Sequence, residues 1–390
     1  MPSPEGESGD NDLATAQRPL TADSPPPLPG GLIGRFVATF DPGYFAFVMA
    51  SGIVSVGTGL LGHPVISDVT LAVTAAGFVA LGPAYLARAV CYAGWFRRSL
   101  RNPVTAMAYF TLVAGTDVLA LRLAMAGYSR IALGLGAAGA LLWLVLTYAL
   151  PWSVVAAARR PVLAEFNGTW LIWVVATQSV AVLAAGVAPS APWPALRQAL
   201  PEVAVTFWGI GVMLYVILIV IIFLRLMLIE VTPAEMGPAY WIAMGATAIS
   251  VRAAAGILAL RTPGSAPLLA GLRPFLVGLS VVLWAFGSWW IPLLVLFGYW
   301  RHVRRRYPLA YEPRLWSMVF PVGMYAVASA TLGKTPGLAF MLTIARGWVW
   351  AGVAAWASVL ALMATAGAQA ARAHRRHRGS SLDRRRGHRG

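Results

Sequence analysis

Ten long apolar segments, separated by short polar breaks, constrain this chain more than any other feature of its sequence. An α-helix needs about 20 apolar residues to cross a bilayer, and each segment approaches or exceeds that length. Charged residues make up only 11% of the chain, against about 25% in soluble domains. The sequence therefore predicts an all-α polytopic membrane protein. We place the segments at Pro42–Leu61, Val69–Tyr92, Pro103–Ala126, Ile131–Ala156, Gly168–Val187, Val203–Ile229, Pro238–Leu260, Pro274–Tyr299, Leu315–Leu332 and Phe340–Ala364.

The odd-numbered segments begin with similar helix-start signals, in which a capping residue precedes Pro or Gly. These signals are Asp41-Pro42, Asn102-Pro103, Asn167-Gly168, Gly237-Pro238 and Glu312-Pro313. Each interval between them holds one outgoing and one returning helix. The sequence therefore predicts five helical hairpins with quasi-fivefold symmetry.

The odd segments are also richer in small residues, for example around Gly52 and Gly245, while residues 217–224 of the sixth segment are bulky and apolar. We expect the odd helices to form an inner ring around a pore and the even helices to face lipid. The alternative is that the small residues only mediate helix packing.

Arginine distribution predicts the topology. Most arginines lie in alternate loops and in the C-terminal tail, so this side should be cytoplasmic, and ten spans put both termini there. We expect a plasma-membrane protein with a disordered tail over residues 1–34, a membrane domain over 35–366 and a basic disordered tail over 367–390. The net charge of +16 follows from topology and lipid headgroups, not from a nucleic-acid partner. Arg88, near the cytoplasmic end of its helix, should snorkel to the surface.

Four charged residues fall inside the predicted spans: Asp117, Arg122, Arg252 and Arg346. Buried ionisable groups are costly in a membrane and are therefore candidates for function. In a structural interpretation, Asp117 neutralises Arg252 or Arg346. In a functional one, an unpaired arginine attracts anions into the pathway, and a proton-relay role for Asp117 is a third alternative.

Metal, cofactor and enzyme functions find no support in the residues. Cys91 is the one cysteine, and the five histidines are scattered without metal-ligand spacing. The spans contain neither paired carboxylates nor a Ser/His/Asp arrangement. We expect no cofactor, no metal and no enzymatic activity.

Residues 316–323 combine a large aromatic ring with helix-breaking residues inside an apolar segment. Pro321 removes a backbone hydrogen bond and is followed closely by Gly323, so a kink is expected beside Phe320.

This segment and five shorter motifs resemble the tellurite-resistance/dicarboxylate transporter family, which includes the plant slow anion channels. The matching residues are Trp316, Phe320 and Pro321 in a W-x-x-x-F-P arrangement, Asn102-Pro103-Val104, Gly168-Thr169-Trp170, Ala176-Thr177-Gln178-Ser179-Val180, Tyr240-Trp241-Ile242 and Met244-Gly245-Ala246. The resemblance implies a homotrimer in which each protomer has its own pore, occluded by the phenylalanine that corresponds to Phe320.

The sequence thus favours an anion channel or uniporter for small anions, gated near Phe320, with Trp316, Pro321, Gly52, Gly245 and Gln178 near the pore. The alternative is a proton-coupled carrier of four-carbon dicarboxylates, sulfite or tellurite, in which Asp117 titrates.

Overall fold

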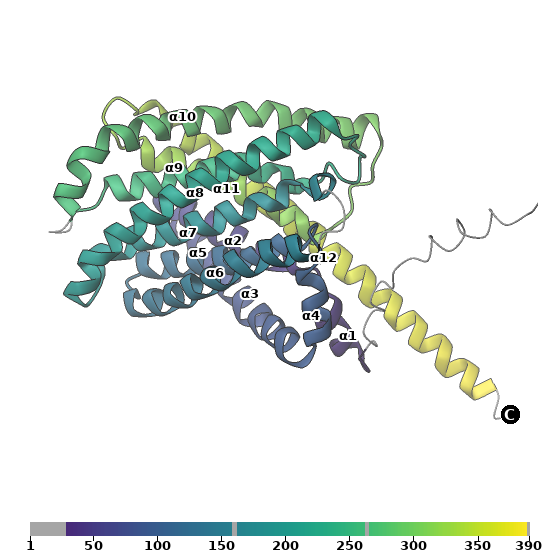
Figure 1. The fold of residues 1–390 in the computed structure, drawn as a ribbon. Coiled ribbons are helices and arrows are strands. Elements are labelled where there is room, and N and C mark those ends of the chain that lie inside the picture. Colours follow the sequence, from purple (N-terminus) through teal and green to yellow (C-terminus); the bar gives the residue numbers. More distant parts are fainter. Residues whose placement is uncertain (1–28, 158–161, 262–264, 388–390) are drawn as a thin grey trace, which may run out of the picture.

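The computed structural model describes residues 29–157, 162–261 and 265–387, and within them the chain forms α-helices joined by short turns (Figure 1). Ten helical segments are long and apolar enough to cross a membrane, which confirms the predicted all-α polytopic fold. The helices are α1 (Leu32–Thr39), α2 (Ala46–Leu60), α3 (Pro64–Cys91), α4 (Ala93–Leu100), α5 (Phe110–Met125), α6 (Ser129–Ala157), α7 (Ile172–Val187), α8 (Pro194–Leu228), α9 (Ile242–Leu258), α10 (Ser265–Tyr299), α11 (Trp316–Leu332) and α12 (Phe340–Gly387).

The spans form an inner and an outer ring. In the odd spans, which contain α2, α5, α7, α9 and α11, 78 to 89% of the most apolar window is buried, against 17 to 39% in the even spans. Each inner helix contacts the next, and α11 contacts α2, so the inner ring is closed. Each inner helix also packs against the outer helix that follows it. The predicted hairpins and inner ring are therefore confirmed.

All five inner helices begin at the same end of the bundle, which we call the basic end, and each begins with a 3₁₀ turn. The turns are Pro42–Phe45, Ala106–Tyr109, Gly168–Leu171, Pro238–Trp241 and Pro313–Leu315. The side chains of Asp41 and Asn167 cap their turns by accepting from the backbone amides two residues on. The expected start at Pro103 is wrong by three residues, because Asn102 instead closes a loop by accepting from Val104 N.

Tryptophans connect the outer ring to the inner one in a repeated way. An indole N–H on an outer helix donates to a hydroxyl or carbonyl oxygen on the inner helix of the next hairpin. The pairs are Trp143 to Thr177 Oγ1, Trp208 to Ser250 O, Trp284 to Ser329 Oγ and Trp356 to Ser51 Oγ, at 2.8 to 3.1 Å. The last pair joins α12 to α2 and closes the circle. Each of these four outer helices therefore bridges two inner helices.

Buried arginines at the basic end tie outer helices to inner ones. Arg88, at the end of α3, donates to Phe40 O at 2.5 Å and lies over the Phe40 ring. Arg301, just after α10, donates in the same way to Met236 O, and both acceptors lie two residues before the Pro of an inner helix start. The expectation that Arg88 snorkels is wrong, because its side chain is only 4% exposed and fastens the start of α2.

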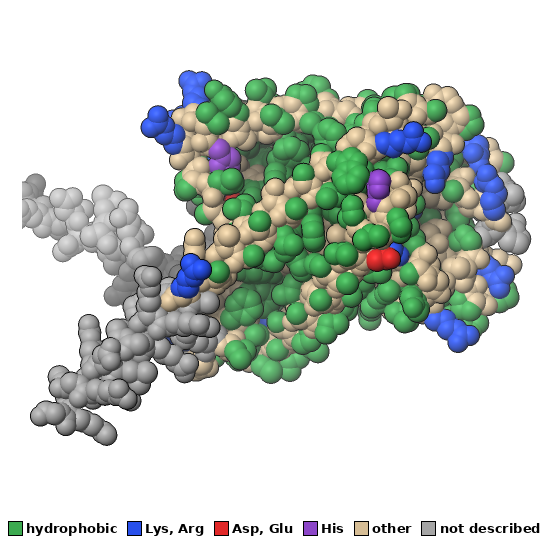
Figure 2. Space-filling view, turned by 180° about the vertical axis from the view of Figure 1, so that it is seen from behind, with side chains coloured by type: hydrophobic (Ala, Val, Ile, Leu, Met, Phe, Trp, Pro, Cys, Tyr) green, Lys and Arg blue, Asp and Glu red, His purple; other side chains and the backbone are tan. Residues whose placement is uncertain are grey.

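Helix α12 is longer than the sequence indicated. It continues through Gly387 and projects beyond the bundle at the end where α1 and α4 lie (Figure 1). The residues predicted as a disordered tail from 367 are thus helical as far as 387, consistent with the Ala and Arg content of the segment. Of the predicted N-terminal tail, residues 1–28 lie outside the described residues, and α1 begins at Leu32. Hydrophobic side chains cover the middle of the face in Figure 2, and Lys and Arg lie toward its two ends.

Candidate permeation pathway

A small cavity lies on the axis of the inner ring. All five inner helices contribute to its lining, which consists of Ile53, Asp117, Val118, Leu121, Ser179, Val182, Ile249, Arg252, Met324 and Val327. Its volume is about 10 Å³, close to the minimum that holds one water molecule. The axis is therefore nearly filled by side chains at this level.

The axial cavity is bordered by one acidic and one basic group. Asp117 is 1% exposed, and its Oδ2 accepts from the Ser179 hydroxyl at 2.6 Å, while its Oδ1 has no partner and lies against Gly139 of α6. Arg252 lines the same cavity from α9, and its buried Nε has no partner. Among the described residues, Asp117 makes no ion pair with an arginine. The structure thus differs from the paired interpretation, since a serine hydroxyl holds Asp117.

Arg122 lies away from the axis, between α5, α2 and α3. Its guanidinium pairs with Asp68 at 2.8 Å and donates from Nε to the hydroxyls of Ser55 and Ser67 at 3.1 Å. These contacts join three helices, and the charge is neutralised there. Arg122 therefore stabilises the packing of α2, α3 and α5.

Arg346 does not belong to the axial group. It is exposed on the outer surface of α12 and is absent from the lining of the axial cavity. The side chain of Arg346 is exposed because the rotation of α12 turns it away from the inner ring. The electrostatic cluster at the axis thus consists of Asp117 and Arg252.

A second small cavity lies at the basic end, among the starts of four inner helices. Asp41, Gly43, Thr105, Thr169, Arg314 and Ser317 are among its lining residues. The Arg314 guanidinium lies 3.7 Å from the Asp41 carboxylate. Because these helix starts carry partial positive charge, this cavity is a favourable place for an anion.

Phe320 lies on α11 between the two cavities. Ser317, three residues before it, lines the cavity at the basic end, and Met324, four residues after it, lines the axial cavity. Residues at these spacings share one face of a helix, so Phe320 is directed to the same side. Its side chain is 0% exposed, although the segment continues as a helix through Pro321.

The other residues that the sequence singled out contact neighbouring helices. A Cβ at Gly245 would lie 2.7 Å from Cγ of Pro321, and a Cβ at Gly52 would lie 2.7 Å from Cγ1 of Val118. Both glycines thus permit close packing within the inner ring, as the alternative interpretation of the small residues expected.

Gln178 and Trp316 also form contacts between helices. Gln178 Nε2 donates to Trp208 O of α8 at 3.1 Å. The Trp316 ring meets Phe47 of α2 edge-on at 5.0 Å, and its indole N–H donates to Tyr311. These residues support the wall of the pathway and do not line either cavity.

Sequence reasoning missed Ser179 as the partner of Asp117 and Arg314 as the partner of Asp41. Ser179 lies in one of the quoted motifs, but its role depends on how α5 and α7 are rotated against each other. The sequence pattern indicates Arg314 only as one of the loop arginines that predict the topology. Its position directly after the helix-start proline of α11 was the signal that could have drawn attention to it.

These features define a ten-span helical membrane protein with a constricted pathway along the axis of its inner ring. Residues 39–364 match the family described as voltage-dependent anion channel, and the chain belongs to this family. The match confirms the resemblance seen in the motifs. Membrane anion transport is therefore the general function of the protein.

Curated relatives agree with this assignment. An uncharacterized transporter of Methanocaldococcus jannaschii is 25% identical over 83% of this chain and 92% of its own length. An uncharacterized membrane protein of Mycobacterium tuberculosis is 44% identical over 37% of this chain and 71% of its own length. The first match extends over most of the bundle.

Proposed function

We propose that the protein is a channel or uniporter that conducts small anions along the axis of the inner ring, with Phe320 as the gate. The observation that carries the proposal is the position of Phe320 on the face of α11 that lines both cavities. A buried ring on that face, between the two cavities, would obstruct an ion that passes from one cavity to the other.

Electrostatics support an anion rather than a cation. Five inner helices direct their N-terminal ends toward the mouth at the basic end, where partial positive charges favour anions. Farther along, the Arg252 guanidinium borders the axial cavity without an ion-pair partner among the described residues. A positive group in a pathway raises the local concentration of anions.

The gate is tested by anion flux into proteoliposomes, measured for chloride, nitrate, sulfite and malate with the wild type and Phe320→Ala. Removing the ring should raise flux of the preferred anion about tenfold or more, which corresponds to about 1.4 kcal/mol of barrier.

Phe45→Ala is the matched control. Phe45 is a phenylalanine of equal burial on an inner span, but its ring packs against Phe78 and Tyr85 of α3. Its variant should conduct like the wild type. If Phe320→Ala, still folded, also conducted like the wild type, Phe320 would not be the gate.

A proton-coupled carrier of dicarboxylates or oxyanions is the second candidate, because the Asp117 carboxyl borders the axial cavity and its Oδ1 is unpartnered. Under this mechanism, an imposed pH gradient should drive uptake of malate or sulfite. Asp117→Asn should abolish this uptake. Currents that do not change when a pH gradient is imposed would instead favour the channel.

We also propose, from the family resemblance, a homotrimer in the plasma membrane with both termini in the cytoplasm. Its function is transport, without a catalysed reaction. The mass of the purified protein, corrected for bound detergent, tests the trimer, and a monomeric mass at working concentration would contradict it.

A further inference from the structure

A large cleft lies beside the pathway, at the basic end. It has a volume of about 770 Å³ and lies between the end of α1, the last turn of α3, helix α4 and the loop that precedes α5. Asp41 and Thr105 line both this cleft and the cavity among the inner helix starts. The cleft therefore lies outside the axis of the inner ring, next to the opening of the pathway at the basic end.

Two buried donors in this cleft lack partners. Arg88 is 4% exposed, and its Nε makes no hydrogen bond although its Nη1 donates to Phe40 O. The indole N–H of Trp95 on α4 is also buried and unpartnered. A buried donor without an acceptor is unfavourable, and here both donors belong to residues that line the same cleft. This arrangement suits a ligand that supplies acceptor oxygens.

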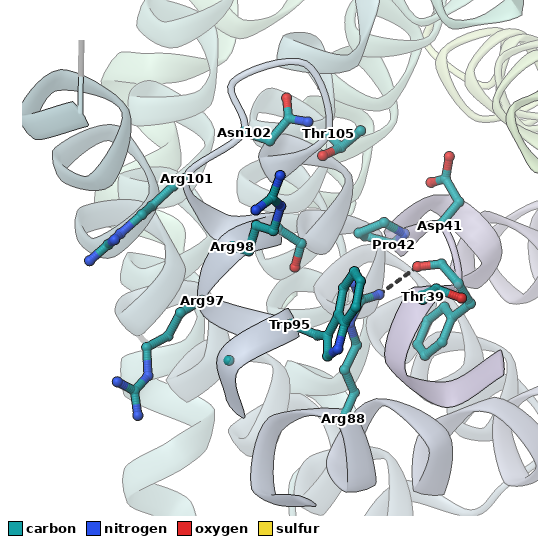
Figure 3. Close-up of a pocket in the computed structure, with 13 residues that line it drawn as sticks. Thr39, Asp41, Pro42, Arg88, Trp95, Arg97, Arg98, Arg101, Asn102 and Thr105 are labelled. Atoms are coloured by element: carbon teal, nitrogen blue, oxygen red, sulfur yellow. Dashed lines mark hydrogen bonds between the residues drawn. The ribbon is translucent and has the colours of Figure 1, made fainter. Parts of the chain in front are cut away.

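Arginines are the most frequent charged residues in the lining of the cleft. They are Arg88, Arg97, Arg98 and Arg101, of which Arg98 and Arg101 have partners of their own, and Asp41 is the carboxylate among the lining residues. Asp41 is already engaged, because it caps the first 3₁₀ turn and pairs with Arg314. In Figure 3, Arg97 and Arg101 lie on one side of the view and Asp41 on the other, with Arg88 and Trp95 between them. Several guanidinium groups around one space are the typical surroundings of a phosphate.

Helix α1 places the cleft at the level of the membrane surface. Ile33 and Phe36 on this helix are 81% and 48% exposed, so α1 presents apolar side chains away from the bundle. It packs against α3 and α4 at the point where the membrane-spanning part of α3 ends. A short helix with such a face lies in the headgroup region of a bilayer. A lipid headgroup beside α1 could therefore reach the cleft.

We propose that this cleft binds the phosphate group of an anionic lipid headgroup. The phosphate oxygens would accept from Arg88 Nε and Trp95 Nε1, and the exposed guanidinium of Arg97 would help to balance the charge. The volume lies within the range of small-molecule sites, about 300 to 1,000 Å³, and far exceeds the space of a single halide ion. Because Arg88 also fastens Phe40, an occupied site would stabilise the start of the first inner helix.

Thermal unfolding of the purified full-length protein in detergent tests this proposal. The added probes are phosphatidylglycerol, phosphatidylcholine, glycerol phosphate and inorganic phosphate, and bound lipid is counted by native mass spectrometry. Phosphatidylglycerol should raise the Tm and remain bound, whereas phosphatidylcholine should do neither.

Trp95→Phe and Arg88→Lys test the named donors. Each removes one of the two unpartnered N–H groups, and Arg88→Lys keeps the charge. Both should weaken the apparent affinity for phosphatidylglycerol about tenfold, the expected effect of losing one hydrogen bond to a charged group. Arg305→Gln is the control, because it removes a charge at the same end, where Arg305 lies over Trp300 outside the cleft.

Three results would overturn the proposal. The first is equal stabilisation by inorganic phosphate and by phosphatidylglycerol, which would identify a site for free oxyanions. The second is an unchanged lipid response in both Trp95→Phe and Arg88→Lys. The third is an equal loss in Arg305→Gln, which would indicate attraction of lipid by net charge alone. None of these readouts requires anion flux, so the proposal can fail while the proposed transport function stands.

Discussion

Arg252 and Arg346 carry the same charge, but the fold gives them different surroundings. Arg252 borders the axial cavity with its Nε unpartnered, whereas Arg346 is exposed on α12. Arg252→Gln should therefore lower anion flux through the Phe320→Ala background about tenfold, since a fixed charge near the pathway contributes on the order of 1 kcal/mol or more.

Arg346→Gln is the matched control for Arg252→Gln, because it removes an equal charge outside the pathway. Its chloride flux should stay within the error of the Phe320→Ala background. Equal losses in the two variants would show that the effect comes from net charge and not from a position on the axis.

The sequence identified Asp117, Arg252 and Phe320 as residues of interest from their type and their position along a helix. It could not find the partner of Asp117, because the contact with Ser179 depends on the rotation of two helices that are far apart in sequence. Arg346 was misplaced for the same reason. Helical height can be counted along the chain, but the direction of a side chain in the ring is set by packing.

At the level of elements, Gly245 lies at a close contact between α9 and α11. A Cβ there would lie 2.7 Å from Pro321 Cγ, and 3.2 Å from its Cα, so backbone must move to admit it. Gly245→Ala should lower stability by about 1–3 kcal/mol, as overpacked contacts do. Gly209→Ala on α8, where nothing lies within 4 Å of the new atom, should leave the Tm unchanged or slightly raised. Equal Tm values for the two variants would contradict the packing role of Gly245.

The hydrogen bonds of the outer-ring tryptophans lead to a second prediction, which concerns the contact between α12 and α2. Trp356→Phe removes the N–H that donates to Ser51 Oγ at 2.9 Å, and about 0.6 kcal/mol is typical of such bonds between membrane helices. Combining it with Ser51→Ala in a double-mutant cycle of unfolding free energies should show coupling of that size. Trp350→Phe, a half-exposed indole on the same helix, should show no coupling to Ser51.

The five-hairpin arrangement could be predicted because the helix-start signals recur in the sequence, and four of the five starts match the structure closely. The exception, near Asn102, arises because its side chain closes a loop rather than capping a helix. The roles of Arg88 and Arg301 were missed, since both donate to backbone oxygens about 50 to 65 positions away in sequence. Such contacts leave no local pattern.

For the whole molecule, the native cysteine offers a test of topology. Cys91 is exposed and ends α3 at the basic end. A membrane-impermeant maleimide should label it in inside-out vesicles but not in intact cells, because the arginine-rich side is expected to be cytoplasmic. In a Cys91→Ser background, Lys334→Cys at the opposite end should show the reverse accessibility. Labelling of Cys91 in intact cells would contradict the proposed orientation.

In the whole molecule, we propose that anions pass along the axis of the inner ring, past Phe320. Current recording from Phe320→Ala in planar bilayers under a potassium chloride gradient tests it most directly. We expect currents that exceed those of the wild type and reverse at the chloride equilibrium potential, without a response to a pH gradient. Absence of added current, or reversal at the potassium equilibrium potential, would contradict it.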